Sequence, residues 1–133
     1  SRSALQNVIL SGKRLSYNHI EALFMTNSVS PWNSWLTQIK HLDLSCNAVD
    51  DACFQLITGK IFDGSLPLLE TLCLQGNRLT NEGLFQFCAS AGALNEDRNK
   101  VLLRKVFLQG NSIEIEAENL REIVDNCPVT ILV

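Results

Sequence analysis

The chain has 133 residues, which is enough for one domain with a buried core and too few for two ordinary domains. Hydrophobic residues make up 46% of the sequence and charged residues 19%, a composition that is typical of a folded, soluble protein and excludes a largely disordered chain. The formal net charge of -3 argues against a domain whose main task is to neutralise phosphates, so nucleic acid is disfavoured as a partner.

The sequence predicts neither a membrane segment nor a secreted protein. No stretch approaches the ~18 consecutive apolar residues that a membrane-spanning helix needs, and residues 1–5 do not resemble a signal peptide. The five cysteines form no C-x-x-C pair, and their odd number favours free thiols in a reducing compartment. We therefore expect a cytoplasmic protein, with the nucleus as the alternative.

A repeated motif predicts the strands. The pattern L-x-x-L-x-L-x-x-N-x-L occurs four times, at residues 5–15, 39–49, 69–79 and 103–113, so the copies begin 34, 30 and 34 residues apart. Each copy begins with alternating apolar and polar residues, which predicts a short strand with one face toward the interior. The inward pairs are Val8 and Leu10, Leu42 and Leu44, Leu72 and Leu74, and Val106 and Leu108. Residues 129–133 alternate in the same way and predict a fifth, partial strand.

The polar position of the motif predicts a ladder of hydrogen bonds between neighbouring units. Asn47, Asn77 and Asn111 occupy this position, and an Asn side chain can both donate to and accept from the backbone of the next unit. Lys13 takes the position in the first copy, and its ammonium group cannot accept a hydrogen bond. We therefore expect the ladder to stop at the first copy, as it does at a terminal unit of a stack.

Helical patterns separate the strands. The expected apolar faces are Ile20, Leu23 and Phe24; Phe54 and Ile57; Leu84, Phe87 and Cys88; and Leu120, Ile123 and Val124. Good N-cap residues precede the first three helices, namely Ser16, Asp50 and Thr80. Residues 26–36, 59–68 and 92–102 are rich in turn formers and are expected to return each helix to the next strand. The last helix starts two residues late, so residues 112–117 must absorb the extra length.

These motifs resemble leucine-rich repeats. Residues 69–88, LETLCLQGNRLTNEGLFQFC, are similar to the long, helix-containing repeat of the ribonuclease-inhibitor subfamily, with Thr80, Gly83 and Phe87 at or near its further motif positions. His19 and Cys53 stand where the first and second units would have that glycine. The resemblance implies one leucine-rich-repeat domain over residues 1–133, an α/β solenoid with repeats starting near 5, 39, 69 and 103, a concave parallel sheet of about five strands and convex helices.

The resemblance also implies that the concave sheet face binds a protein or peptide. Alternation along the strands identifies the side chains on that face, and the candidate partner-binding residues are Asn7, Ile9, His41, Asp43, Thr71, Cys73, Gln75, Lys105, Phe107 and Gln109. Phe107 is an exposed aromatic residue among polar neighbours, which is typical of a contact anchor. We expect a module of a larger intracellular scaffold or regulator. Alternatively, a following repeat or cap covers Phe107 and Leu132.

No catalytic residue, metal or cofactor is expected. His41 and Cys73 are predicted on neighbouring strands, but a nucleophilic pair also needs a third group to orient it, and nothing in the spacing supplies one. Two other functions stay open besides protein binding. One is a GTPase-activating or regulatory protein of the Ran type, which rests on the resemblance alone.

The other open function is an RNA-contacting adaptor. A basic cluster before and within the fourth strand could meet an RNA backbone or an acidic partner, and it consists of Arg98, Lys100, Arg104 and Lys105. Acidic residues on the last helix offset this cluster, so its electrostatic signal is weak. Trp32 and Trp35, in the segment after the first helix, are a second candidate contact or a cover for the helix beneath them.

Overall fold

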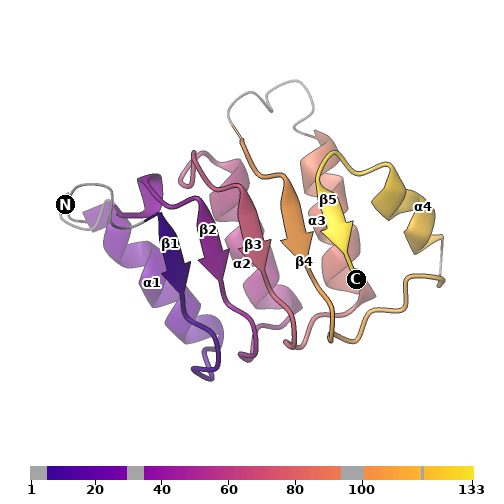
Figure 1. The fold of residues 1–133 in the computed structure, drawn as a ribbon, viewed down its shortest axis with the longest axis horizontal. Helices are drawn as coiled ribbons and strands as arrows, with labels where there is room; N and C mark the ends of the chain where they lie inside the picture. Colours follow the sequence, from indigo (N-terminus) through magenta and orange to yellow (C-terminus); the bar gives the residue numbers. More distant parts are fainter. Residues whose placement is uncertain (1–5, 30–34, 94–100, 118) are drawn as a thin grey trace.

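The computed structural model describes residues 6–29, 35–93, 101–117 and 119–133 of the chain. Within this part, five short strands form one sheet, in which neighbouring strands are parallel and follow one another in chain order (Figure 1). They are β1 (Asn7–Ile9), β2 (His41–Asp43), β3 (Thr71–Cys73), β4 (Lys105–Phe107) and β5 (Thr130–Leu132). Each strand lies where the motif or the terminal alternation predicted it.

The helices lie on one side of this sheet. They are α1 (Tyr17–Val29), α2 (Asp51–Phe62), α3 (Asn81–Ala93) and α4 (Leu120–Asp125). Figure 1 shows α1, α2 and α3 behind the strands, whereas α4 lies beyond β5 at the end of the sheet. No described helix covers the opposite side, which we call the open sheet face. Its strand residues are Asn7, Ile9, His41, Asp43, Thr71, Cys73, Lys105, Phe107, Thr130 and Leu132.

The core fills the space between the sheet and the helices. The middle residue of each strand faces inward: Leu42, Leu72 and Val106 are 0% exposed. The predicted helix faces supply the other side of the core, including Ile20, Phe24, Phe54, Ile57, Leu84, Phe87 and Leu120. The rings of Phe54 and Phe87 stack with centroids 5.3 Å apart, so an aromatic contact joins α2 to α3.

Three helices extend further than the sequence predicted. The proposed return segments at 26–36, 59–68 and 92–102 are wrong at their starts, because α1, α2 and α3 continue into them. Helix α2 passes through Gly59 and ends at Phe62. Ile61 is 1% exposed, and the Phe62 ring lies 5.6 Å from that of Phe87. This burial outweighs the cost of about 1 kcal/mol that a glycine imposes inside a helix.

The asparagine ladder is present between neighbouring units, which we call coils: each coil is a motif copy with its following helix. The side chain of Asn77 donates to the carbonyl oxygens of Leu44 and Leu74, at 3.0 Å each. Its Oδ1 accepts from the backbone N–H groups of Asn47 and Val49 at 3.1 and 3.0 Å. Each asparagine therefore pairs buried backbone groups of its own coil and of the coil before it.

The ladder ends at the first described coil, as predicted. Asn47 Oδ1 accepts from the backbone N–H groups of Lys13 and Leu15, at 2.9 Å each. The Lys13 side chain takes no part in these bonds, because an ammonium group cannot accept from a backbone N–H group. The first coil can therefore stack on the second with Lys in place of Asn, because Asn47 supplies the hydrogen bonds between them.

Two predicted N-cap residues behave differently. Asp50 caps α2, because its side chain accepts from the backbone N–H of Cys53 at 2.9 Å. Thr80 precedes α3, but both its N–H and its hydroxyl donate to the carboxylate of Asp51 in α2. A Cβ at Gly83 would overlap this carboxylate. The glycine of the long repeat motif thus makes room for a carboxylate from the preceding coil.

The fourth coil is less regular. The extra residues are absorbed between 112 and 117, where the chain turns without forming a helix. Asn119 precedes α4 with a φ of 61° and makes no side-chain capping bond. Leu120 is buried as predicted, while Ile123 and Val124 are only half-buried. The short α4 therefore covers less of the core than the other helices do.

Candidate functional site

The strand registers align the predicted binding residues in two rows across the open sheet face. The first row is Asn7, His41, Thr71, Lys105 and Thr130, and the second is Ile9, Asp43, Cys73, Phe107 and Leu132. Parallel strands lie about 4.8 Å apart, so consecutive members of a row are direct neighbours. Both rows alternate with the buried middle residues, which places their side chains on the side away from the helices.

None of the ten candidate residues is part of the core. Ile9 is 68% exposed. Asn7, His41, Lys105 and Gln109 are also exposed, and Asp43, Thr71, Cys73, Gln75 and Phe107 are half-buried. Phe107 stands between Cys73 and Leu132 in its row. The second row therefore presents an apolar strip around Phe107 at the β4 and β5 end of the sheet, with a separate apolar residue, Ile9, at the β1 end.

Asp43 has a fixed position in the second row. Its Oδ1 accepts hydrogen bonds from both the backbone N–H and the hydroxyl of Ser45, at 2.9 and 2.7 Å. Asp43 is the register partner of Cys73 on β3. Burial and, to a lesser degree, the Asp43 carboxylate raise the pKa of the Cys73 thiol. The face therefore carries an oriented carboxylate beside a thiol that stays protonated.

This arrangement does not fit nucleophilic catalysis. The register pairs His41 with Thr71 rather than with Cys73. A catalytic cysteine needs surroundings that favour its thiolate, whereas burial and Asp43 disfavour the thiolate of Cys73. Within the described residues, no group of three or more His, Cys, Asp or Glu side chains is placed to hold a metal ion.

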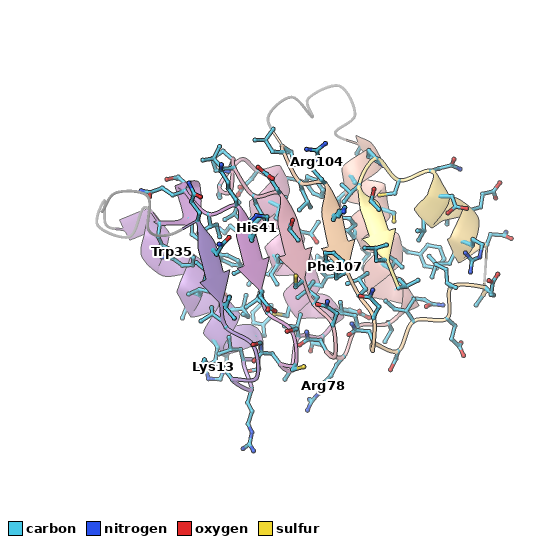
Figure 2. All side chains as sticks on the ribbon, in the orientation of Figure 1. Lys13, Trp35, His41, Arg78, Arg104 and Phe107 are labelled. Atoms are coloured by element: carbon cyan, nitrogen blue, oxygen red, sulfur yellow. The ribbon has the colours of Figure 1, made fainter. Side chains whose placement is uncertain are left out.

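Basic side chains flank the open sheet face at both ends of the strands. Figure 2 shows Arg104 at the start of β4, Lys13 and Arg78 beyond the opposite ends of the strands, and Phe107 between these two edges. All three basic side chains, and Lys105 in the first row, are exposed. Among the described residues, the ion pair that forms joins Arg121 to Glu116 at α4 and involves none of these cations. The flanking cations are therefore free to meet an anionic partner.

The sequence placed Gln75 among the candidate binding residues but did not predict the hydrogen bonding of its side-chain amide. It follows β3, and its Oε1 is buried without a hydrogen-bond partner among the described residues. An unpaired buried oxygen costs roughly 1–3 kcal/mol. A simple alternation pattern identifies which face a residue lies on, but it does not show whether the amide finds a partner.

Sequence reasoning also missed two features on the helix side. A groove of about 240 Å³ lies between α2 and α3, lined by Gln55, Thr58, Gly59, Phe62, Gly83, Gln86, Phe87 and Ser90. The interaction of Cys88 with Cys127 raises the pKa of Cys88 and lowers that of Cys127. These cysteines are 39 residues apart and form no spacing motif, so nothing in the sequence signals this interaction.

Some predicted contacts lie outside the described residues. Trp32, Arg98 and Lys100 belong to this group, so the second candidate contact and the basic cluster are described only in part. Trp35 is half-buried and packs against the core, in agreement with a covering role. No described helix is both long enough and apolar enough to span a membrane.

Comparisons with known proteins match the repeat pattern and the fold. A family model described as "Leucine Rich repeat" matches residues 36–52 and 65–88, which contain the second and third motif copies. Among solved structures, a chain titled "Leiomodin-1 Actin-Binding Site 2 (ABS2)" superimposes with a TM-score of 0.61 and 13% sequence identity, over 95% of this chain and 80% of that one. No curated protein sequence matches this chain. At this identity the structural likeness concerns the fold.

Proposed function

We propose that this leucine-rich-repeat solenoid of the α/β class binds a protein or peptide partner on its open sheet face. The observation that carries the proposal is the second row of that face, where Phe107 and Leu132 stand side by side and none of the described helices covers them. Apolar side chains that stay in contact with water and are surrounded by polar groups are typical of an interface. An aromatic residue at the centre of such a patch is the usual anchor.

The polar groups around this strip suit a specific partner. Lys105 lies on β4 with Phe107, Arg104 directly precedes that strand, and both are exposed. Asp43 is held in one orientation by Ser45. Charges at the rim of an interface mainly set orientation and association rate, while the desolvated anchor supplies affinity. A partner that offers a donor to Gln75 would also satisfy its unpaired Oε1.

The proposal includes a wider setting. We assign the chain to the ribonuclease-inhibitor type of repeat, which the lengths of α1, α2 and α3, at 12 or 13 residues, support. We place it in a larger cytoplasmic scaffold or regulator. The five free cysteines support a reducing compartment.

Monomeric actin is the first defined probe, because the solved neighbour is titled an actin-binding site. The comparison that tests the proposal is Phe107→Ala against Phe85→Ala. Both phenylalanines are half-buried, but Phe85 lies in α3 on the helix layer. We expect binding of the captured partner, whether actin or a protein isolated from lysate, to weaken about tenfold or more in Phe107→Ala and to stay within twofold in Phe85→Ala.

Thermal unfolding of both variants accompanies the binding measurement, because loss of either half-buried ring lowers stability by roughly 1 kcal/mol. The opposite pattern, in which Phe85→Ala abolishes capture, moves the interface to the helix layer. Binding that fades steeply with rising salt and requires RNA points to phosphate contacts instead. Both results contradict the proposal.

A further inference from the structure

Charged side chains of opposite sign occupy different parts of the molecule. The described residues of the four motif copies carry six cations and two carboxylates, whereas the other described residues carry two cations and nine carboxylates. The cations of the motif copies are Lys13, Arg14, Lys40, Arg78, Arg104 and Lys105. The chain has a net charge of -3, yet the segments that form strands β1 to β4 are positively charged.

Four of these cations lie around the apolar strip of the open sheet face. Lys105 is in the first row, two residues before Phe107 on β4, and Arg104 directly precedes that strand. Lys13 and Arg78 lie beyond the opposite ends of the strands, so Phe107 stands between two positive edges (Figure 2). All four cations are exposed, and the ion pair found among the described residues lies at α4 and involves none of them. Their charge is therefore available to a partner.

The two carboxylates of the motif copies leave the Phe107 end of the face open to an anion. Asp43 on β2 is two strands away from Phe107, about 10 Å at the usual strand spacing, and it already accepts two hydrogen bonds from Ser45. Physiological salt screens charges beyond about 8 Å. Glu70 is half-buried and makes no ion pair with the residues that the structure describes. A carboxylate that approaches Lys105 therefore meets mainly positive charge.

The spacing of the cation and the apolar anchor suits an extended peptide. Lys105 and Phe107 lie on the same face of β4, and two residues of a strand span about 6.6 Å. Alternate side chains of an extended peptide have the same separation. A peptide also carries backbone N–H groups, one of which could donate to the unpaired Oε1 of Gln75. A nucleic acid brings negative charge but has no aliphatic side chain to cover Leu132.

We propose that the open sheet face binds an acidic peptide segment, in which an apolar side chain packs on Phe107 and Leu132 and a neighbouring carboxylate meets Lys105. This inference rests on the proposed function of the face and adds the chemistry of its partner. Arg104 and the cations at the opposite edge attract the same segment over a longer range. Charge therefore mainly raises the association rate, and the apolar contact slows dissociation.

The test selects peptides on the immobilised 133-residue chain from a displayed library of random sequences about 12 residues long. Such peptides, when extended, exceed the roughly 19 Å across five strands. We expect the selected peptides to carry Asp or Glu about two positions from Leu, Phe or Trp, and to be depleted in Lys and Arg. A synthetic copy of one selected peptide is then the probe for affinity measurements with each variant.

Charge reversal separates the acidic preference from the packing. Lys105→Glu should weaken binding of the selected peptide about tenfold, mainly through slower association. A copy of the peptide with Lys in place of its acidic residues should bind Lys105→Glu more tightly than it binds the unmodified chain. Lys60→Glu is the matched control, because it changes the net charge equally from the last turn of α2, and it should leave the affinity within about twofold.

The outcomes distinguish this inference from the proposed function. Peptides that require Phe107 but show no acidic bias overturn the inference alone. Peptides that tolerate Phe107→Ala but are lost in Phe85→Ala contradict the proposed function as well.

Three further results also count against an acidic peptide partner. They are a selection that yields no binder, a loss in Lys60→Glu as large as that in Lys105→Glu, and displacement of the peptide by single-stranded RNA at a lower concentration than by free peptide. The last result indicates a phosphate backbone as the partner.

Discussion

The third and fourth coils carry the same motif, but the third makes more ladder hydrogen bonds and has a longer helix than the fourth. Asn77 in the third coil is 8% exposed and makes hydrogen bonds to two backbone N–H groups and three carbonyl oxygens. Asn111 in the fourth coil is half-buried and pairs one N–H group and two carbonyl oxygens. The helix that follows is 13 residues long in the third coil and six in the fourth.

The motif determines where the strand and the ladder asparagine lie. The neighbouring coils determine how much each asparagine contributes to the free energy of unfolding. Asn77 lies in the middle of the stack and is buried among the backbone groups of the second and third coils. Asn111 lies where the chain turns irregularly before α4, so water can replace part of its hydrogen bonding. The same amide is therefore worth more in a coil that has a full helix layer above it.

The largest expected effect is the difference between Asn77→Ala and Asn111→Ala. Loss of the Asn77 side chain leaves buried backbone groups of two coils unpaired, and we expect the free energy of unfolding to fall by about 4 kcal/mol. The equivalent loss at Asn111 should cost about 2 kcal/mol. Urea unfolding measures both values. Equal losses would break the comparison, and Asn126→Ala, which removes an exposed side chain, serves as the control.

A smaller effect is expected at the interface of α2 and α3. In Gly83→Ala, the new methyl group overlaps the Asp51 carboxylate, which is bonded to Thr80, and stability should fall by roughly 1–2 kcal/mol. Gly92→Ala, near the other end of α3, meets no atom within 4 Å and should raise stability by about 0.5 kcal/mol.

A double-mutant cycle sharpens this result. In an Asp51→Ala background the methyl group at position 83 meets no carboxylate, so Gly83→Ala should cost measurably less there than in the wild type. A cost that is independent of Asp51 would show that the glycine serves the backbone of α3 instead.

The smallest effect concerns the ion pair beside α4. The Arg121 guanidinium, through its hydrogen bond, lowers the pKa of Glu116. The pair therefore stabilises the fold above the ordinary carboxyl pKa, and its contribution is lost as the pH falls through the lowered value of the folded state. Both side chains are more than half exposed, so the contribution is small and salt weakens it.

Arg121→Gln tests this assignment. A carboxyl NMR titration should show the pKa of Glu116 moving upward in the variant, with a change in melting temperature near the detection limit. High salt should move the wild-type value in the same direction. An unchanged titration in the variant would place the cause of the lowered pKa elsewhere.

Much of this fold could be predicted from the sequence, because its information is local and periodic. Alternation placed Asp43, Cys73 and Phe107 in one row, and the spacing of the motif placed the asparagines in a ladder. The exact end of α2 could not be predicted from the sequence. Gly59 favours an earlier end, whereas the contact of Phe62 with Phe87, which the sequence does not reveal, stabilises the helix beyond it.

The contacts that escaped prediction join residues from different coils. Asp51 in α2 accepts a hydrogen bond from Thr80, which precedes α3, and Cys88 and Cys127 change each other's pKa across 39 residues. A repeat motif describes the residues that form one unit. Contacts between side chains of different units depend on which particular units stack, so the motif does not predict them. The repeat motif likewise does not predict which partner the open sheet face binds, because that depends on a molecule outside the chain.

The direction of the asparagine ladder also bears on how such arrays change in length. Each Asn satisfies the coil before it, so a duplicated unit inserted behind an existing one brings the amide that its predecessor requires. Growth by duplication then demands no compensating substitution in the units already present. An array of this kind can evolve a longer recognition surface one unit at a time.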